Sequence, residues 1–302
     1  MKYSFLINSI FFLSLLFACS PQTNIEINPA TPESTSTPSP IIPSPTPTPS
    51  KTATVTSSPT PTPTPLTCWQ EGGAVVENQI ESDLVHNPFE FLVYLPPCYQ
   101  YEPERYYPVL YLIHGQSFKH DQWDRLGADE VADALIAAGD ISPFMIVMPR
   151  VIDWEQPPEA KFGQAVLDEL IPFIDSAYRT IPDREFRAIG GLSRGAAWSL
   201  HLGLTEWEMF GIFGAHSLPV FWNDALQVPA WVDAIPQESF PRIYIDLADQ
   251  DLKAIRKSTK HFIDLLIEKD ILHEFYIFPG IHEEEYWSAH VEEYIRFYTL
   301  EW

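Results

Sequence analysis

Short apolar runs alternate with amphipathic segments through most of the chain after residue 75. The run at 109–113, Val-Leu-Tyr-Leu-Ile, is apolar throughout, which is typical of a strand covered on both faces. Alternating strands and helices predict an α/β fold with a mostly parallel sheet and helices on both faces. The predicted strands are 75–82, 89–95, 109–113, 144–148, 186–190, 210–215, 243–247 and 275–278; the predicted helices are 128–138, 161–178 (continuing past Pro172 or kinked there), 252–269 and 286–300.

The N-terminal residues have the pattern of an export signal. Lys2 precedes an apolar stretch at 5–18, which is too short for a comfortable membrane span and suits a signal peptide covering residues 1–18. Residues 16–19, Leu-Phe-Ala-Cys, resemble the lipobox of bacterial lipoproteins, although Phe17 is bulkier than usual there. The resemblance implies a lipid on Cys19 and a membrane anchor outside the cytoplasm. The alternative is an ordinary signal peptide with an incidental cysteine.

A linker rich in proline, threonine and serine follows over residues 19–67. Thirteen of the 29 prolines lie between Pro21 and Pro65. This composition cannot bury a core and favours extended, disordered chain. Residues 68–302 then suit one large α/β domain held away from a membrane surface.

Acidic residues dominate the charge of the chain. There are 41 acidic residues against 18 basic ones, a formal net charge of −23. Such a protein repels nucleic acid, so a nucleic-acid partner is not expected. The acidity does not name a substrate, and its plain interpretation is a solvated surface.

Two cysteines, Cys68 and Cys98, remain besides Cys19. An even pair in an exported chain predicts a disulfide, which would join the start of the domain to the end of strand 89–95. A catalytic or metal-binding role is disfavoured, because the sequence has no Cys-x-x-Cys pair and no metal-ligand spacing around these residues. No metal site is therefore predicted.

Residues 191–195, Gly-Leu-Ser-Arg-Gly, lie between a predicted strand and a predicted helical segment. In that context Gly-x-Ser-x-Gly is typical of a nucleophile elbow, in which a strained turn exposes the serine hydroxyl. The glycines let strand and helix approach closely. Ser193 is the predicted nucleophile, and the amide of Arg194 is a predicted oxyanion donor. The alternative is a glycine-rich turn that holds an inert serine.

A serine nucleophile needs a base and an orienting acid, which follow it in the order Ser, acid, His on this architecture. His282 follows the last predicted strand, and Gly280 allows the turn that would aim its ring inward. His216, at the end of strand 210–215, is the rival base. For the acid, Asp249 and Asp251 share the loop after strand 243–247, and one of them could instead cap the next helix.

The second oxyanion donor is expected after strand 109–113, where residues 114–117 read His-Gly-Gln-Ser. A His-Gly pair at this place suits a backbone that approaches an acyl oxygen closely. The amide of Gln116 or of Ser117 is the predicted donor. His114 is expected to have an oriented structural role, with substrate contact as the other possibility.

Together these motifs resemble an esterase family of the α/β-hydrolase fold that includes feruloyl esterases, S-formylglutathione hydrolases, enterochelin esterases and mycolyltransferases. The likeness covers most of residues 75–300. Here Arg194 stands where the family usually has Met, Ala196 where it has a second Gly, and Ala248 where its acid loop opens with Gly. The motifs are Tyr-Leu-Ile-His-Gly at 111–115 with Trp-Asp at 123–124, the elbow at 191–195, Ala-Asp-Gln-Asp at 248–251, and Gly-Ile-His at 280–282 with Tyr-Trp at 286–287.

The resemblance implies a serine hydrolase that cleaves carboxylic esters without a cofactor. It favours Asp251 as the acid, because Asp251 takes the place of the acid in the family's Gly-x-x-Asp loop. Acyl transfer, as in the mycolyltransferases, and a catalytically silent surface binding module are the alternatives. The substrate is expected to be a small-molecule or carbohydrate-linked ester. Candidate residues at the mouth of the site are His114, Trp123, Trp154 and Trp287, although such aromatic residues are more often core.

Overall fold

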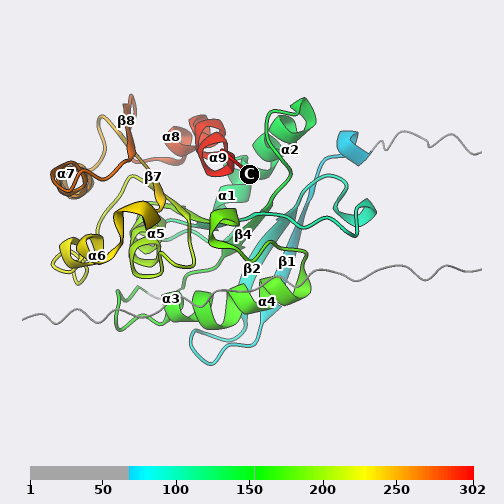
Figure 1. Cartoon of the computed structure of the whole chain (residues 1–302), viewed down its shortest axis with the longest axis horizontal. Coiled ribbons are helices and arrows are strands. Elements are labelled where there is room, and N and C mark those ends of the chain that lie inside the picture. Colours follow the sequence, from blue (N-terminus) through cyan, green and yellow to red (C-terminus); the bar gives the residue numbers. More distant parts are fainter. Residues whose placement is uncertain (1–67, 153) are drawn as a thin grey trace, which may run out of the picture. The chain divides into compact units, whose positions relative to one another are not determined.

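The computed structural model describes residues 68–152 and 154–302. The predicted signal peptide (1–18), the linker (19–67) and the predicted lipidation site Cys19 lie outside the described residues. The described chain forms an eight-stranded sheet with the order β1-β2-β4-β3-β5-β6-β7-β8. Figure 1 shows helices on both sides of the strands. The first two strands pair antiparallel, and β2 pairs antiparallel with β4, whereas β3 to β8 run parallel. The predicted mostly parallel sheet is therefore confirmed.

All eight strands lie where the apolar pattern predicted them, with ends shifted by up to two residues. The strands are β1 (Ala74–Ile80), β2 (Phe89–Leu95), β3 (Val109–Ile113), β4 (Met145–Pro149), β5 (Arg187–Leu192), β6 (Ile212–His216), β7 (Arg242–Ala248) and β8 (Glu274–Phe278).

Helices cover both faces of this sheet. The sequence of β3 is continuously apolar because its side chains enter the cores on both faces. Val109, Tyr111 and Ile113 pack into one core with helices α3 to α7. Leu110 and Leu112 pack into the opposite core with α1, α2, α8 and α9. The helices are α1 (Gln122–Arg125), α2 (Ala128–Ala138), α3 (Phe162–Ala165), α4 (Ile171–Ala177), α5 (Arg194–Thr205), α6 (Val228–Ala234), α7 (Lys253–Glu268), α8 (Glu284–Ala289) and α9 (Val291–Thr299).

Two of the predicted helices are not single α-helices. The helix predicted over 161–178 consists of α3, a π-helical segment η3 (Val166–Leu170) and α4. Pro172 has no N–H and its ring crowds the carbonyl four residues earlier, which accounts for the wider π turn just before it. The helix predicted over 286–300 is divided at His290, which has a non-helical backbone and separates α8 from α9. Short 3-10 helices lie at Cys68–Gln70, Tyr99–Tyr101, Arg184–Phe186 and Gln237–Ser239.

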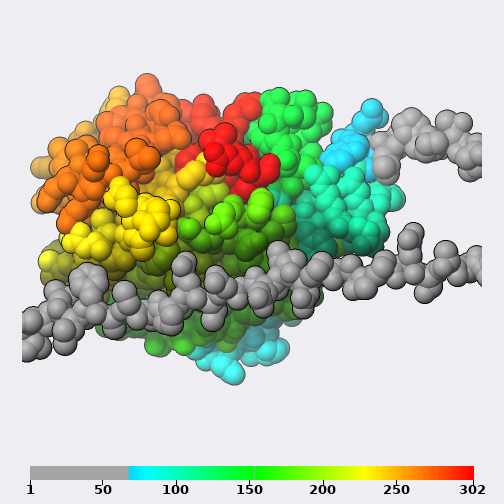
Figure 2. All heavy atoms as spheres, viewed as in Figure 1, coloured from blue at the N-terminus to red at the C-terminus, as the bar shows by residue number. Residues whose placement is uncertain are grey.

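The two ends of the described chain are fixed to the sheet layers. Cys68 and Cys98 form a disulfide, with their Cα atoms 5.1 Å apart, and join the first described residue to the end of β2. At the other end, α9 packs beside α2, and the hydroxyl of Ser142 donates to the carbonyl of Trp302 at 2.9 Å. Figure 2 shows the red C-terminal surface against the green surface of this region. Within the described residues, no helix has the length and apolar character needed to cross a membrane.

Candidate active site

Ser193 lies at the tip of a sharp turn between β5 and α5. Its backbone has φ 51° and ψ −120°, a strained conformation for a residue with a side chain. A Cβ added to Gly191 would lie 2.4 Å from the carbonyl carbon of Gly195, and one added to Gly195 would lie 2.1 Å from the carbonyl oxygen of Ile113. The two glycines therefore let the helix cross the strand ends, and the N–H of Ser193 donates to the carbonyl of His216 at 2.8 Å.

Loops after β7 and β8 bring two further side chains to Ser193. His282 Nε2 lies 2.9 Å from Ser193 Oγ, and His282 Nδ1 lies 2.9 Å from Asp251 Oδ1. The three residues are 31 and 89 positions apart, so the parallel strands rather than local sequence create this chain of contacts. With Nδ1 donating to the carboxylate, Nε2 can accept the serine proton. The arrangement can thus activate a hydroxyl and transfer its proton.

Asp251 and the ring of His282 are held by buried neighbours. Asp251 is 3% exposed, and burial alone would raise the pKa of its carboxyl. Hydrogen bonding with His282 and Ser217 outweighs burial and lowers the pKa below its usual value, so the carboxylate stays charged. Trp287 packs its indole edge-on against His282, with ring centroids 4.8 Å apart, and donates Nε1–H to the hydroxyl of Ser217 at 3.3 Å.

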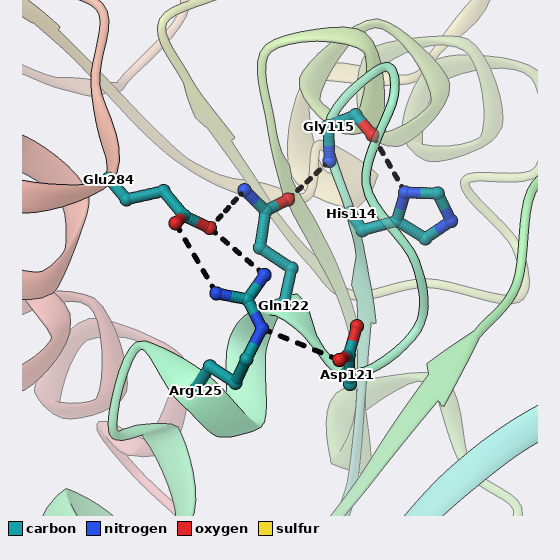
Figure 3. Close-up of polar contacts among 6 residues, drawn as sticks. All are labelled: His114, Gly115, Asp121, Gln122, Arg125 and Glu284. Atoms are coloured by element: carbon teal, nitrogen blue, oxygen red, sulfur yellow. Dashed lines mark hydrogen bonds and ion pairs between the residues drawn. The ribbon is translucent and has the colours of Figure 1, made fainter.

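The loop after β3 lies beside the elbow, because Ile113 pairs with Gly191 in the sheet. His114 is buried, and its Nε2 accepts the N–H of Val151 at 2.9 Å, so its proton is on Nδ1, which donates to the carbonyl of Gly115 at 2.7 Å (Figure 3). Burial lowers the pKa of His114 to about 4, although the Gly115 carbonyl opposes this. The ring is therefore neutral at physiological pH.

This contact fixes the orientation of the next amide. The carbonyl of Gly115 and the N–H of Gln116 belong to one planar trans peptide and point in opposite directions. Among the described residues, neither Gln116 nor Ser117 has a protein acceptor for its N–H. Both amides remain candidate oxyanion donors, and the orientation of the Gln116 amide is set by His114.

The four candidate mouth residues have different environments. Trp123 is not a mouth residue, because it is 1% exposed and donates to the Ile113 carbonyl at 3.0 Å from inside the core. Trp287 is 3% exposed and contacts His282 rather than solvent, and His114 is likewise buried. Trp154 is 64% exposed, in the loop after β4.

That loop is attached to the elbow through Arg194. Its guanidinium donates to the carbonyl of Glu155 and lies over the ring of Phe221, with its central carbon 5.2 Å from the ring centroid. The Arg194 side chain therefore extends along the wall made by the loops after β4 and β6. This wall also carries Trp222, which is 84% exposed and whose N–H donates to Gln156 Oε1 at 2.7 Å.

His216, the rival base, lies in the core and does not contact the side chain of Ser193. It is completely buried, its Nδ1 lies 2.6 Å from Asp246 Oδ1, and its Nε2 lies 2.9 Å from the hydroxyl of Tyr298. Asp246 also accepts the hydroxyls of Tyr286 and Tyr294, so the carboxylate has three donors. The sequence did not predict this network; its one signal was Asp246, a charged residue within the apolar run of β7.

In the described part of the chain, no cluster of three or more His, Cys, Asp or Glu residues could hold a metal ion.

Comparison with known protein families identifies the family of this chain. Residues 82–297 match the family model described as "Putative esterase". The chain belongs to this esterase family. The match includes every strand except β1, and it also includes the elbow, the loop with Asp251 and the loop with His282. The family resemblance seen in the sequence is therefore confirmed.

Individual relatives match different shares of the chain. An endo-1,4-β-xylanase/feruloyl esterase of Xylanibacter ruminicola is 36% identical over 155 residues, 47% of this chain but 21% of that protein. An esterase of Mycobacterium tuberculosis is 31% identical over 137 residues, 42% of this chain and 28% of its own length. The chain thus spans less than a third of these curated relatives.

Solved structures of esterases with the α/β-hydrolase fold are similar to the fold of this chain. A ferulic acid esterase has a TM-score of 0.68 at 24% identity and covers 76% of this chain and 98% of that one. An S-formylglutathione hydrolase of Staphylococcus aureus has a TM-score of 0.62 at 17% identity, covering 75% and 96%. These likenesses confirm the predicted fold class.

Proposed function

We propose that this protein is a serine esterase that cleaves carboxylic esters through Ser193, His282 and Asp251. The observation that carries the proposal is the continuous hydrogen-bond chain from Asp251 through His282 to Ser193 Oγ, with both links at 2.9 Å. Membership in the esterase family supports the reaction class. A metal or organic cofactor has no part in the proposed reaction.

The chemistry follows from these positions. Ser193 Oγ attacks the ester carbonyl carbon while its proton passes to His282 Nε2, and Asp251 stabilises the imidazolium that forms. The amides of Arg194 and of Gln116 or Ser117 would hold the oxyanion of the tetrahedral intermediate. His282 then gives its proton to the departing alcohol, leaving an acyl-enzyme. Water attacks this ester by the reverse sequence and releases the acid and free Ser193.

For the substrate, we propose an ester with an aromatic acyl group or a carbohydrate alcohol. Two exposed tryptophans, Trp154 and Trp222, lie on the loops that form the wall beside Arg194. Flat aromatic faces suit stacking on planar or sugar rings. Because both side chains are exposed, packing of the core does not account for them. The relatives named for feruloyl ester cleavage support the same class.

The proposed place of action is outside the cytoplasm, with the domain anchored to a membrane through a lipid on Cys19. The signal-like residues 1–18 and the proline-rich linker support this. The Cys68–Cys98 disulfide also fits an oxidising compartment.

Covalent capture tests the proposed mechanism. The full-length protein is treated with a fluorophosphonate, digested, and analysed by mass spectrometry. One phosphonyl adduct on the peptide containing Ser193, formed more slowly while an excess of a hydrolysed ester is present, is the expected result. An unmodified Ser193 in protein that hydrolyses esters would refute it.

A substitution on the tryptophan wall tests the proposed substrate class. Trp154→Ala should raise KM for a feruloylated sugar several-fold and leave hydrolysis of p-nitrophenyl acetate unchanged.

A further inference from the structure

Gln122 is a buried polar side chain that connects two parts of the candidate site. It lies on α1 and is 0% exposed. Its Oε1 accepts the N–H of Gly115 at 2.8 Å, and its Nε2 donates to Glu284 Oε1 at 3.0 Å. Glu284 begins α8, 162 residues further along the chain and two residues after His282. Figure 3 shows the amide of Gln122 between the two.

We propose that Gln122 is a positioning residue that joins the oxyanion loop (residues 114–118) to the histidine loop (residues 279–283) through Gly115 and Glu284. The inference rests on the proposed function, since it concerns the geometry of that same site. One amide side chain then fixes the positions of both the oxyanion donor and the base.

On the oxyanion side, Gln122 completes the fixation of Gly115. His114 holds the carbonyl of Gly115, and Gln122 holds its N–H, so both polar groups of this residue are occupied. A Cβ at Gly115 would lie 2.8 Å from the side chain of Leu192, so the loop lies directly against the residue that precedes Ser193. The amide of Gly115 is thus excluded as an oxyanion donor, and the next amides along the loop take positions set by these contacts.

On the histidine side, Glu284 is held from two directions. Arg125 approaches its carboxylate at 3.1 and 3.3 Å, and Asp121 lies 3.4 Å from Arg125 Nε (Figure 3). These side chains are partly exposed, with 43% of Arg125 and 32% of Glu284 accessible. Solvent weakens the ion pair, whereas the Gln122 side chain is itself buried and its contact with Gly115 is shielded from water. Of the side chains in this connection, buried Gln122 is therefore held in its position more firmly than the partly exposed Arg125 and Glu284.

The competing explanation is that Gln122 only satisfies the buried N–H of Gly115 and matters for folding alone. Gln122→Glu separates the two explanations. It keeps an acceptor for Gly115 but places a carboxylate against the carboxylate of Glu284. A merely structural acceptor predicts an unchanged kcat. A positioning role predicts that kcat for p-nitrophenyl acetate falls about 10- to 100-fold with KM within about threefold, because an oxyanion donor is worth more than this when lost outright.

Rescue makes the test specific. The double variant Gln122→Glu with Glu284→Gln restores one hydrogen bond between the two side chains with reversed polarity. It should return kcat to within about threefold of the unmodified protein. Glu284→Gln alone keeps an acceptor for Gln122 and should change little, whereas Glu284→Ala should resemble Gln122→Glu. Arg296→Gln is the control, because it removes two exposed ion pairs, with Glu292 and Asp140, that involve neither Gln122 nor its partners.

A boronic acid inhibitor adds a readout that folding alone does not move. The serine Oγ bonds to boron, and an oxygen of the resulting tetrahedral boronate occupies the oxyanion position. The Ki of the inhibitor should therefore rise by the same factor by which kcat/KM falls. Equal kcat and equal Ki in Gln122→Glu, or a double variant no better than the single one, would overturn the inference. If the unmodified protein lacks esterase activity, or Ser193→Ala retains it, the proposed function fails instead, so the two failures are distinguishable.

Discussion

Asp249 accepts the backbone N–H of Gly280 on its Oδ1 at 3.0 Å. The acid loop and the histidine loop are therefore joined at their bases, and Gln250 strengthens the joint by donating its N–H to the carbonyl of Gly280 at 3.0 Å. The two aspartates of the acid loop thus have different partners. Asp249 holds the backbone before His282, and Asp251 contacts the His282 ring itself.

This difference predicts unequal effects of two matched substitutions. Asp251→Asn should lower kcat by roughly 10²- to 10⁴-fold, because the amide no longer selects the tautomer that accepts the serine proton. Asp249→Asn keeps an oxygen acceptor for Gly280 and should cost less than about tenfold. Steady-state kinetics of both variants with one chromogenic ester decide between them. A crippled Asp249→Asn beside an active Asp251→Asn would move the acid to position 249.

The buried ring of His114 predicts how stability depends on pH. Its pKa is lowered to about 4 in the fold, from an ordinary value of 6.5, mainly by burial. Between these values the unfolded chain binds a proton that the folded protein does not, so stability falls as the pH falls from 6.5 to 4. The contribution is on the order of 3 kcal/mol in full.

Urea unfolding at a series of pH values measures this effect. His114→Asn keeps a donor for the Gly115 carbonyl and cannot titrate, so its free energy of unfolding should fall less steeply over this range than that of the unmodified protein. Identical slopes in the two proteins would show that His114 does not carry this pH dependence.

The cysteine pair predicts a cross-linked peptide. Digestion of the oxidised protein without reductant should release a peptide pair joining Cys68 to Cys98, since the two Sγ atoms are bonded in the fold. Mass spectrometry before and after reduction identifies the pair. Two free thiols in protein prepared from an oxidising compartment would be the contrary result.

Lipidation of Cys19 is a separate prediction from the sequence, because this residue lies outside the described part of the chain. Cells fed a labelled fatty acid should yield labelled protein that enters the detergent phase, and Cys19→Ser should abolish both properties. A mature, unlabelled protein that begins at another residue would contradict it.

Much of the fold follows from local sequence patterns. The buried parallel strands, such as β3 and β4, were recognisable because strands covered on both faces need continuous apolar runs. Helices α1 and α6 were not predicted, since one has four residues and the other follows a loop without a strong period. The division of the last helix at His290 also went unrecognised, because an apolar period continues across it.

The site was predictable to the extent that its motifs are local. The elbow, the acid loop and the histidine loop each have a short signature, so Ser193, His282 and Asp251 could be named before their contacts were known. Trp123 lies in the core, which was the alternative that the sequence left open, because its burial depends on contacts with His216 and Tyr294 that no local pattern reports. The contacts of Gln122 with Gly115 and Glu284 were beyond sequence reasoning, since they join segments brought together by the completed sheet.

The nucleophile is the central claim, and Ser193→Ala tests it most directly. Initial rates with p-nitrophenyl acetate are compared for the unmodified protein, Ser193→Ala and the matched control Ser176→Ala, an exposed serine on α4. Turnover should fall by roughly 10⁴- to 10⁶-fold in Ser193→Ala and stay unchanged in Ser176→Ala, with all three proteins melting at similar temperatures. A folded Ser193→Ala protein with near-normal turnover would contradict the account.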